Sequence, residues 1–250
     1  MKHIIEELKN LAKLGIVGIK QSFEDEGALQ QDVLTMRRIT EQAGVDLSVK
    51  IGGCEAKTDI QFCKTIGVNK LVAPMIETPF ALTKFIESVA DINDMKFYIN
   101  IESHHAQNNL KEILESPSSK LLSGIVLGRS DMIKSYGQSK DQVDGYMMND
   151  IVTNSFKTAR REYGLHTIMG GNLSPRSSNI ICTLYNDKLL NCIETRNVII
   201  QLNDSNIKDI SNLIKMSLLF ESEWLKYKAE SYNSLGRSYI TRSEIIKDRL

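Results

Sequence analysis

The sequence carries no net charge, no long apolar run and no basic stripe. Lysine plus arginine and aspartate plus glutamate number 31 each, so no overall field attracts nucleic acid or an acidic membrane surface. Basic residues interleaved with aromatic ones, which mark many nucleic-acid interfaces, do not occur either. No apolar stretch approaches the roughly 18 residues that a membrane span needs. We therefore expect neither a nucleic-acid partner nor a membrane partner.

Signals for export and for disulfide formation are also missing. The first seven residues contain two glutamates and lack the hydrophobic core of a signal peptide. The four cysteines, Cys54, Cys63, Cys182 and Cys192, show no CxxC pairing and no zinc-like spacing. We interpret them as reduced thiols in a cytoplasmic protein.

Short apolar runs alternate with helix-length segments along most of the chain. Period-two and buried runs predict seven strands, and helical spacing of apolar residues predicts the segments between them. The predicted strands are 15–22, 47–51, 70–76, 96–101, 124–127, 166–169 and 197–202. The predicted helices are 4–14, 29–43, 58–66, 79–89, 108–114, 149–163, 177–190 and 207–232. Such alternation favours a parallel sheet with helical crossovers.

A closed barrel and an open doubly wound sheet both fit this alternation. An open sheet usually has a glycine-rich nucleotide loop after its first strand, but Gly27 stands alone there. We therefore predict an α/β fold of the (β/α)8 TIM type. The opening segment is helical where a first strand is expected, which leaves open a barrel with a modified or missing first strand. Residues 1–204 would form this catalytic barrel, and residues 205–250 a helical extension for packing or oligomerisation.

Charged, amide and glycine residues follow the ends of the predicted strands. In a parallel barrel these ends meet on one face, where such enzymes place their chemistry. The candidates are Lys20, Glu24, Glu26, Lys50, Gly52, Gly53, Glu77, Asn100, Glu102, Arg129, Asp131, Gly170, Gly171 and Arg196. We expect a catalytic role for Lys50, Glu77, Glu24 and Glu26, and substrate binding by Lys20, Gly52, Gly53, Asn100, Arg129, Gly170, Gly171 and Arg196.

Two carboxylates, Glu102 and Asp131, each end a separate apolar run. Side chains of this kind from neighbouring strands are suited to share one hard divalent cation, with open positions for water and a chelating 2-keto acid. Chelation would withdraw electrons from the keto group and stabilise an enolate. Lys50 or Arg129 would bind the substrate carboxylate or add to that stabilisation.

Other interpretations of these residues remain open. Glu102 and Asp131 also fit as ordinary strand-end carboxylates that pair with cations. Lys50 also fits as a Schiff-base lysine, although a buried acidic partner would favour its charged form and argue against that role. Gly170 and Gly171 are equally compatible with a tight turn.

Four segments carry a resemblance to a known family. They are VKIGG (49–53), APMIET (73–78), INIES (99–103) and GIVLGRSD (124–131). In order and approximate spacing they resemble the HpcH/HpaI aldolase and citrate lyase β-subunit family over roughly residues 15–202. The resemblance implies a metal-dependent barrel that makes or breaks C–C bonds through a pyruvate- or acetyl-type enolate. It also implies Mg²⁺ or Mn²⁺ held by Glu102 and Asp131, and a C-terminal helix exchanged between subunits.

The sequence departs from this family at two catalytic positions. Lys50 stands where the family usually has an arginine, which loses the planar fork that holds a carboxylate at two points. The histidine of the family's first loop has no counterpart, and residues 23–27 (FEDEG) occupy that region. Glu77 does match the family's acidic position. The family's metal-binding positions are therefore matched more completely in this sequence than its acid–base positions.

Together these features predict a cytoplasmic, homo-oligomeric carbon–carbon lyase of aldolase type. It would use Mg²⁺ or Mn²⁺ and act on a small 2-keto acid, with proton transfer by Glu24, Glu26 or Glu77. Two alternatives remain: a citrate-lyase-like reaction on an acyl thioester, and a non-catalytic barrel used for binding or assembly.

Overall fold

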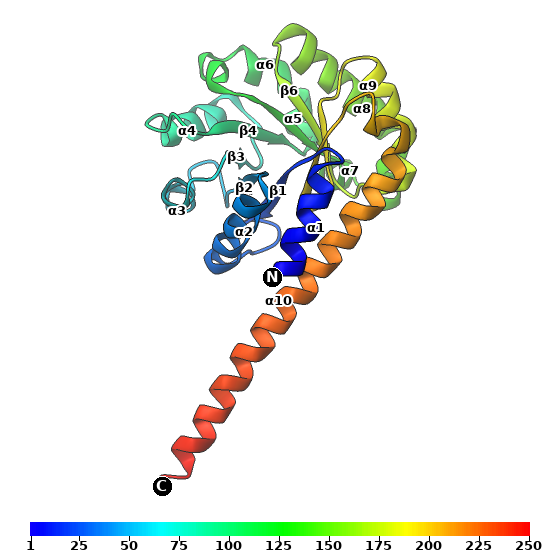
Figure 1. The fold of residues 1–250 in the computed structure, drawn as a ribbon. Helices are drawn as coiled ribbons and strands as arrows, with labels where there is room; N and C mark the ends of the chain where they lie inside the picture. The colour runs from blue at the N-terminus through cyan, green and yellow to red at the C-terminus, as the bar shows by residue number, and fades with distance from the viewer.

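The computed structural model describes residues 1–250. Eight strands form a closed barrel in chain order, and helices surround it (Figure 1). The strands are β1 (Ile16–Ser22), β2 (Asp46–Lys50), β3 (Lys70–Ala73), β4 (Lys96–Ile101), β5 (Gly124–Gly128), β6 (His166–Gly170), β7 (Cys192–Glu194) and β8 (Val198–Gln201). The predicted TIM-type barrel with a C-terminal helical extension is confirmed.

Helices connect the strands and cover the outside of the barrel. They are α1 (Lys2–Ala12), α2 (Gln30–Ala43), α3 (Lys57–Ile66), α4 (Pro79–Val89), α5 (His104–Asn108), α6 (Leu110–Glu115), α7 (Arg129–Ser135), α8 (Tyr146–Lys157), α9 (Ser178–Asn186) and α10 (Ile210–Lys247). Short helical turns are η1 (Pro117–Leu121), η2 (Lys140–Asp144), η3 (Thr158–Glu162), η4 (Pro175–Ser177) and η5 (Asn206–Asp209). None of the helices combines the length and hydrophobicity that crossing a membrane requires.

Helix α4 shows how local sequence sets these elements. Thr78 is its N-cap and accepts a hydrogen bond from the backbone N–H of Ala81, while Pro79 takes the first helical position. The N-cap hydroxyl pairs one of the free backbone N–H groups of the first turn, and proline has no N–H that would need a partner there. Its buried face, Leu82, Phe85, Ile86 and Val89, follows helical spacing toward the barrel.

The sequence left open whether the first barrel strand was modified or missing; the predicted strand 15–22 is present and forms β1. The strand that the sequence pattern did not reveal is β7, which is only three residues long and lies just after the predicted helix 177–190. Strand β8 is antiparallel to both β7 and β1, so the barrel is not wholly parallel. Three residues separate β7 from β8, whereas a parallel connection needs a dozen or more, so the chain has to reverse.

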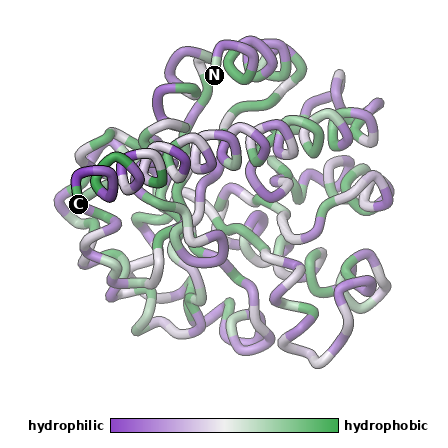
Figure 2. Tube along the Cα trace, turned by 90° about the horizontal axis from the view of Figure 1, so that it is seen from below, coloured by the Kyte–Doolittle hydropathy of each residue, from purple (hydrophilic) through white to green (hydrophobic).

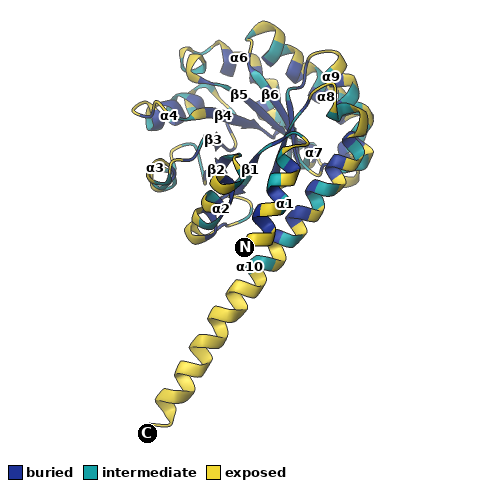
Figure 3. Cartoon of the chain, in the orientation of Figure 1, coloured by how far each residue is buried: buried dark blue, intermediate teal, exposed yellow.

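The hydrophobic core has two parts. The larger lies between the barrel and its helices, and the smaller fills the barrel interior with Val72, Tyr98, Val126, Ile168, Cys192 and Ile199 (Figure 3). All four cysteines are unpaired, so no disulfide contributes to holding the fold.

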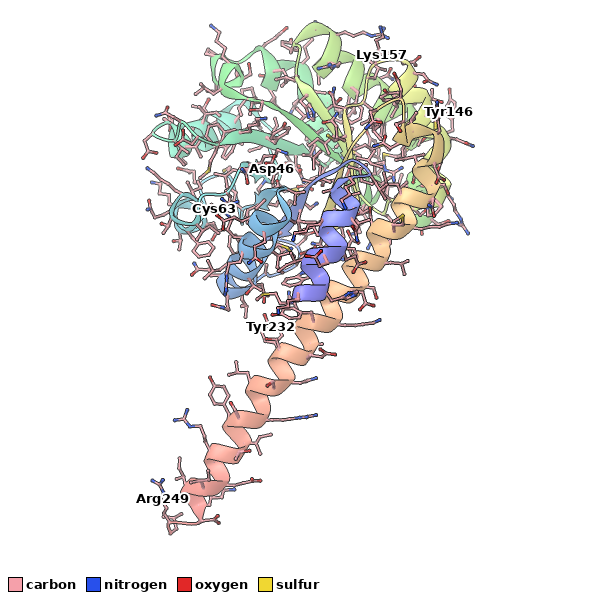
Figure 4. The ribbon with its side chains drawn as sticks, viewed as in Figure 1. Asp46, Cys63, Tyr146, Lys157, Tyr232 and Arg249 are labelled. Carbon is pink, nitrogen blue, oxygen red and sulfur yellow. The ribbon has the colours of Figure 1, made fainter.

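Helix α10 begins against the barrel and then leaves it. Its 38 residues span about 57 Å at the standard helical rise. The first half buries an apolar stripe that ends at Trp224, whereas residues 229–250 have no buried position (Figure 3). The Tyr232 hydroxyl donates to Asp32 at the start of α2, and Arg249 lies near the far end (Figure 4). Hydrophobic and hydrophilic residues alternate along the helix (Figure 2).

Candidate active site

On four strands, an inward-facing apolar residue is followed two positions later by a second inward-facing residue. The first residues form an apolar layer and the second ones a polar layer. Side chains two positions apart on a strand point to the same side. The apolar residues Tyr98, Val126, Ile168 and Cys192 are followed at that spacing by Asn100, Gly128, Gly170 and Glu194. The polar layer therefore lies at the carboxyl ends of the strands, the face on which we expected the site.

A cavity of about 490 Å³ opens above this polar layer. Only two of its 18 lining residues, Leu173 and Leu218, are hydrophobic. The charged lining residues are Lys20, Asp25, Lys50, Glu102, Asp131, Lys134, Lys140, Glu194, Arg196 and Glu221. Such a lining suits a small, strongly polar ligand and not an apolar one.

Glu102 follows β4 and is almost fully buried in the cavity wall. Its Oε2 accepts from Lys50 Nζ at 3.1 Å and from Asn100 Nδ2 at 2.8 Å, and its Oε1 accepts from the Met75 N–H at 3.1 Å. Met75 adopts a left-handed φ of 50°, which costs a non-glycine residue about 1 kcal/mol or more. That strain directs the Met75 N–H at the carboxylate, so the surroundings fix the orientation of Glu102.

Lys50 ends β2 and holds two carboxylates at once. Its ammonium lies 2.7 Å from Glu24 Oε2 and 3.1 Å from Glu102 Oε2. Burial alone would lower the pKa of Lys50, but the attraction of Glu102 and Glu24 outweighs it and raises the pKa. A lysine that stays charged is a poor Schiff-base nucleophile. The geometry therefore favours electrostatic stabilisation over covalent chemistry for Lys50.

Asp131 lines the same cavity from the first turn of α7, directly after β5. Its Oδ1 lies 2.8 Å from Lys134 Nζ on the next turn of that helix. Glu102 and Asp131 thus reach one cavity from successive strands. The structure contains no group of three or more histidine, cysteine or acidic side chains placed to hold a metal ion.

The donor atoms at this place nevertheless suit a hard cation. Mg²⁺ is commonly held by one or two carboxylates, with water and substrate completing its shell, so three protein ligands are not required. Asn100 Oδ1 is buried and makes no hydrogen bond although Asn100 lines the cavity. An unpaired amide oxygen in the residue that holds Glu102 fits a cation or a polar ligand at this position.

Two further ion pairs involve predicted residues. Lys20 Nζ lies 2.6 Å from Glu194 Oε1, and both side chains are nearly buried in the cavity wall. Arg196 Nε lies 2.9 Å from Glu26 Oε1 at the exposed edge of the cavity. Lys20 and Arg196 therefore reach the cavity, as does Asn100.

Comparison with known proteins identifies the family of this chain. A model of the HpcH/HpaI aldolase/citrate lyase family matches residues 30–170, which is more than half of the chain. The chain belongs to the HpcH/HpaI aldolase/citrate lyase family. No curated protein sequence matches it.

Solved structures share the fold of this HpcH/HpaI family chain. A family protein from Burkholderia cenocepacia has 14% identity and a TM-score of 0.63, and the match covers 88% of this chain and 90% of that one. An HpcH/HpaI aldolase from Desulfitobacterium hafniense has 11% identity and a TM-score of 0.61, with 76% and 81% covered. The citrate synthase SbnG has 14% identity and a TM-score of 0.61, with 88% and 89% covered.

Arg129 is the predicted substrate-binding residue that the structure places elsewhere. Its guanidinium is fully buried and is not part of the cavity lining. It lies 2.7 Å from Asp144 Oδ1 and donates to the carbonyls of Gly170, Gly171 and Val143. Since these groups occupy its donors, Arg129 ties α7, η2 and the end of β6 together instead of binding substrate.

All three predicted proton-transfer residues also lie outside the cavity lining. Glu77 accepts from the Ser103 hydroxyl, Glu24 pairs with Lys50, and Glu26 pairs with Arg196. Glu24 and Glu26 thus do not reach the cavity themselves, but each forms an ion pair with a residue that does, Lys50 and Arg196 respectively. Glu77 instead fixes Ser103, the N-cap of α5.

The predicted glycines have structural explanations. The Gly52 N–H donates to Asp59 Oδ2, and neither Gly52 nor Gly53 lines the cavity. A Cβ on Gly170 would lie 2.9 Å from Glu194 Oε1, so this glycine makes room for that carboxylate. Gly171 does line the cavity, but its φ of 84° and its closeness to the backbone of Arg129 indicate a tight turn.

Several cavity residues were not predicted from the sequence. Glu194 follows Cys192 on the inward face of β7, a pattern that was missed because residues 191–196 were assigned to neither helix nor strand. Lys134 and Lys140 lie on α7 and η2, which the sequence pattern did not separate from a loop. Glu221 interrupts the apolar stripe of α10 and is buried there. The available sequence signal was an acidic residue at a position where the helical spacing calls for an apolar one.

Proposed function

We propose that this protein is a divalent-metal-dependent carbon–carbon lyase of aldolase type that acts on a 2-keto acid through a pyruvate-like enolate. One observation carries the proposal: Glu102 and Asp131 line the same polar cavity as the charged ammonium of Lys50. Membership of the aldolase/citrate lyase family supports the reaction class. The metal and the substrate are inferred from the chemistry of the cavity.

Each of these residues has a defined part in the proposal. Glu102 and Asp131 would hold Mg²⁺ or Mn²⁺, which when bound polarises the keto group of the substrate. Lys50 would face the oxygen on which enolate charge develops, because its raised pKa keeps it cationic. The Lys20 ammonium would attract the carboxylate of the bound acid from the cavity wall, and Asn100 would hold Glu102 in place through its amide N–H.

The test is pyruvate release from 2-keto-3-deoxy acids with Mg²⁺ or Mn²⁺, compared with metal-free protein in EDTA. We expect release only with metal, and at least a roughly 100-fold loss in Glu102→Gln, because a catalytic carboxylate ligand is removed. The matched control is Glu87→Gln, whose carboxylate is exposed and pairs with Lys84. Absence of both pyruvate release and metal-dependent proton exchange at pyruvate C3 would contradict the proposal.

The projecting part of α10 supports a homo-oligomer. Leu225, Tyr232, Tyr239 and Ile246 recur every seven residues and are all at least 40% exposed. A seven-residue apolar repeat is typical of a helix that packs on another helix, and a second copy of this chain supplies that partner. Light scattering should give a multiple of 28.2 kDa, and removal of residues 229–250 should lower that multiple. The cytoplasmic location stays a prediction.

A further inference from the structure

Glu221 is the cavity residue that comes from the C-terminal helix and whose carboxyl group is held on one side only. Its Oε1 accepts from the Thr195 hydroxyl at 2.5 Å, the Asn197 N–H at 2.5 Å and the Val198 N–H at 3.2 Å. Its Oε2 makes no hydrogen bond and keeps some exposed surface, although the residue as a whole is buried. Because Glu221 lines the cavity, that free oxygen faces the space where substrate would bind.

The other carboxyl groups of the cavity are committed to cations. Glu102 lies 3.1 Å from Lys50, Asp131 lies 2.8 Å from Lys134, and Glu194 lies 2.6 Å from Lys20. Each of these three carboxylates is therefore already paired with a lysine ammonium, whereas Glu221 Oε2 has no such partner.

Asp25 has no ion pair within 4 Å, but its surroundings also keep it ionised. Burial would raise its pKa, yet the Ser22 hydroxyl and the cations Lys20, Lys50 and Arg196 outweigh burial and lower it. The pKa of Glu221 is shifted in the opposite direction, upward. Burial raises its pKa and outweighs both its three hydrogen bonds and the more distant Lys20. A carboxyl group whose pKa moves toward neutrality suits general acid–base catalysis.

We propose that Glu221 is the catalytic acid–base residue of this site, moving the proton between the substrate hydroxyl and pyruvate C3. The proposal rests on the lyase function proposed above. It replaces the expected Glu24, Glu26 and Glu77, none of which lines the cavity. It also assigns a chemical role to a residue of the C-terminal helix.

The step balances without any further reactant. Glu221 Oε2, as carboxylate, takes the proton of the C4 hydroxyl of a 4-hydroxy-2-keto acid. The O–H electron pair forms the aldehyde C=O, the C3–C4 bond breaks, and its electron pair becomes the pyruvate enolate. After the aldehyde departs, the protonated Glu221 gives the same proton to C3. Pyruvate and an aldehyde result, and Glu221 returns to its carboxylate form.

The decisive measurement is hydrogen–deuterium exchange at the pyruvate methyl group, followed by ¹H NMR in D₂O with Mg²⁺. Glu221→Gln keeps an oxygen that accepts from Asn197 and Val198, so the turn between β7 and β8 should stay in place. We expect exchange to fall at least roughly 100-fold, the usual contribution of a general acid–base group. The affinity of the variant for pyruvate, measured by calorimetry, should stay within about threefold of the affinity of the unaltered protein.

Glu223→Gln is the matched control, because Glu223 lies on the same helix, does not line the cavity and pairs with Lys226. It should exchange at the unaltered rate. If the unaltered protein neither exchanges protons nor releases pyruvate, the lyase function itself fails. If it exchanges and Glu221→Gln exchanges equally fast, only the role of Glu221 is overturned.

A second variant covers loss of folding. Glu221→Asp keeps the carboxylate but withdraws it by one methylene, and circular dichroism reports whether either variant is folded. Should Glu221→Gln fail to fold, we expect Glu221→Asp to slow exchange at least roughly tenfold while pyruvate still binds. An unchanged exchange rate in Glu221→Asp would then overturn the proposal.

Discussion

Lys50 Nζ lies 3.1 Å from Oε2 of Glu102, and strand β3 separates the two strands that carry these residues. Both side chains are almost fully buried, so the contact crosses the interior of the barrel mouth. Glu24 reaches the same ammonium from the loop after β1. The Lys50 ammonium thus holds two carboxylates from different parts of the chain. Removing it should therefore affect the stability of the fold as well as the chemistry of the site.

Replacing Lys50 with methionine should destabilise the fold. Glu102 would then be buried without a counter-charge, and losing one partner of such a pair costs roughly 3 kcal/mol. Urea unfolding followed by circular dichroism measures the change. Lys64→Met is the control, since Lys64 pairs with the exposed Asp91 and its loss should not be measurable. Equal unfolding midpoints for both variants would contradict the prediction.

Arg129→Lys should lower stability without weakening substrate binding. Lysine cannot reproduce the fork that reaches Asp144, Ser177 and three backbone carbonyls, so several buried acceptors lose their donor. We expect a loss of roughly 2–4 kcal/mol in urea unfolding and an unchanged KM for the keto acid. Arg38→Lys, on an exposed face of α2, is the control. A tenfold higher KM at unchanged stability would restore a substrate role for Arg129.

Gly128→Ala should disturb the carboxylate site through space alone. The added Cβ would lie 3.0 Å from Glu102 Cβ and 3.1 Å from its Oε2, while the Gly128 φ of −88° is open to alanine. Overpacking of this kind costs about 1–3 kcal/mol. We expect weaker Mn²⁺ binding by calorimetry and a lower unfolding midpoint. Gly53→Ala is the control, because its Cβ would meet nothing within 4 Å; similar effects in both variants would argue against the mechanism.

Local sequence signals predicted most of the fold. Strand 96–101 and helix 79–89 coincide with β4 and α4, because an apolar run and a capped amphipathic segment each mark their own limits. Strand β7 has three residues and shows no period, so nothing in the local sequence marks it as a strand. The reversal at β8 was not predicted, because it follows from the short turn after β7, and that turn is evident only once β7 is known to be a strand.

The site was predictable where topology alone decides position. Lys50, Glu102 and Asp131 follow strands, and the carboxyl ends of parallel strands meet at one face. The same rule failed for Arg129, because it locates a residue at a strand end but does not tell which way the side chain turns. Glu221 was missed because its partners, residues 195–198, lie on a hairpin far from it in the sequence. Contacts of that kind arise only in the folded chain.

The opposite end of the barrel carries a pH-sensitive residue. His166 begins β6, and its ring packs edge-on against Tyr98 at 5.9 Å between centroids. Burial, with Lys70, Arg160 and Lys96 nearby, lowers the pKa of His166 from 6.5 to about 4. The folded protein therefore binds fewer protons than the unfolded chain between these two values.

It follows that this histidine favours folding fully above pH 6.5 and that the contribution is lost as the pH falls toward 4. The shift corresponds to at most roughly 3 kcal/mol. His166→Gln should reduce the difference in unfolding free energy between pH 7 and pH 4.5, measured by urea unfolding, because glutamine does not titrate. His105→Gln, at an exposed position on α5, should leave that difference unchanged. If His166→Gln keeps the full difference as well, the carboxylates alone set the acid sensitivity, since only they would then change charge in this range.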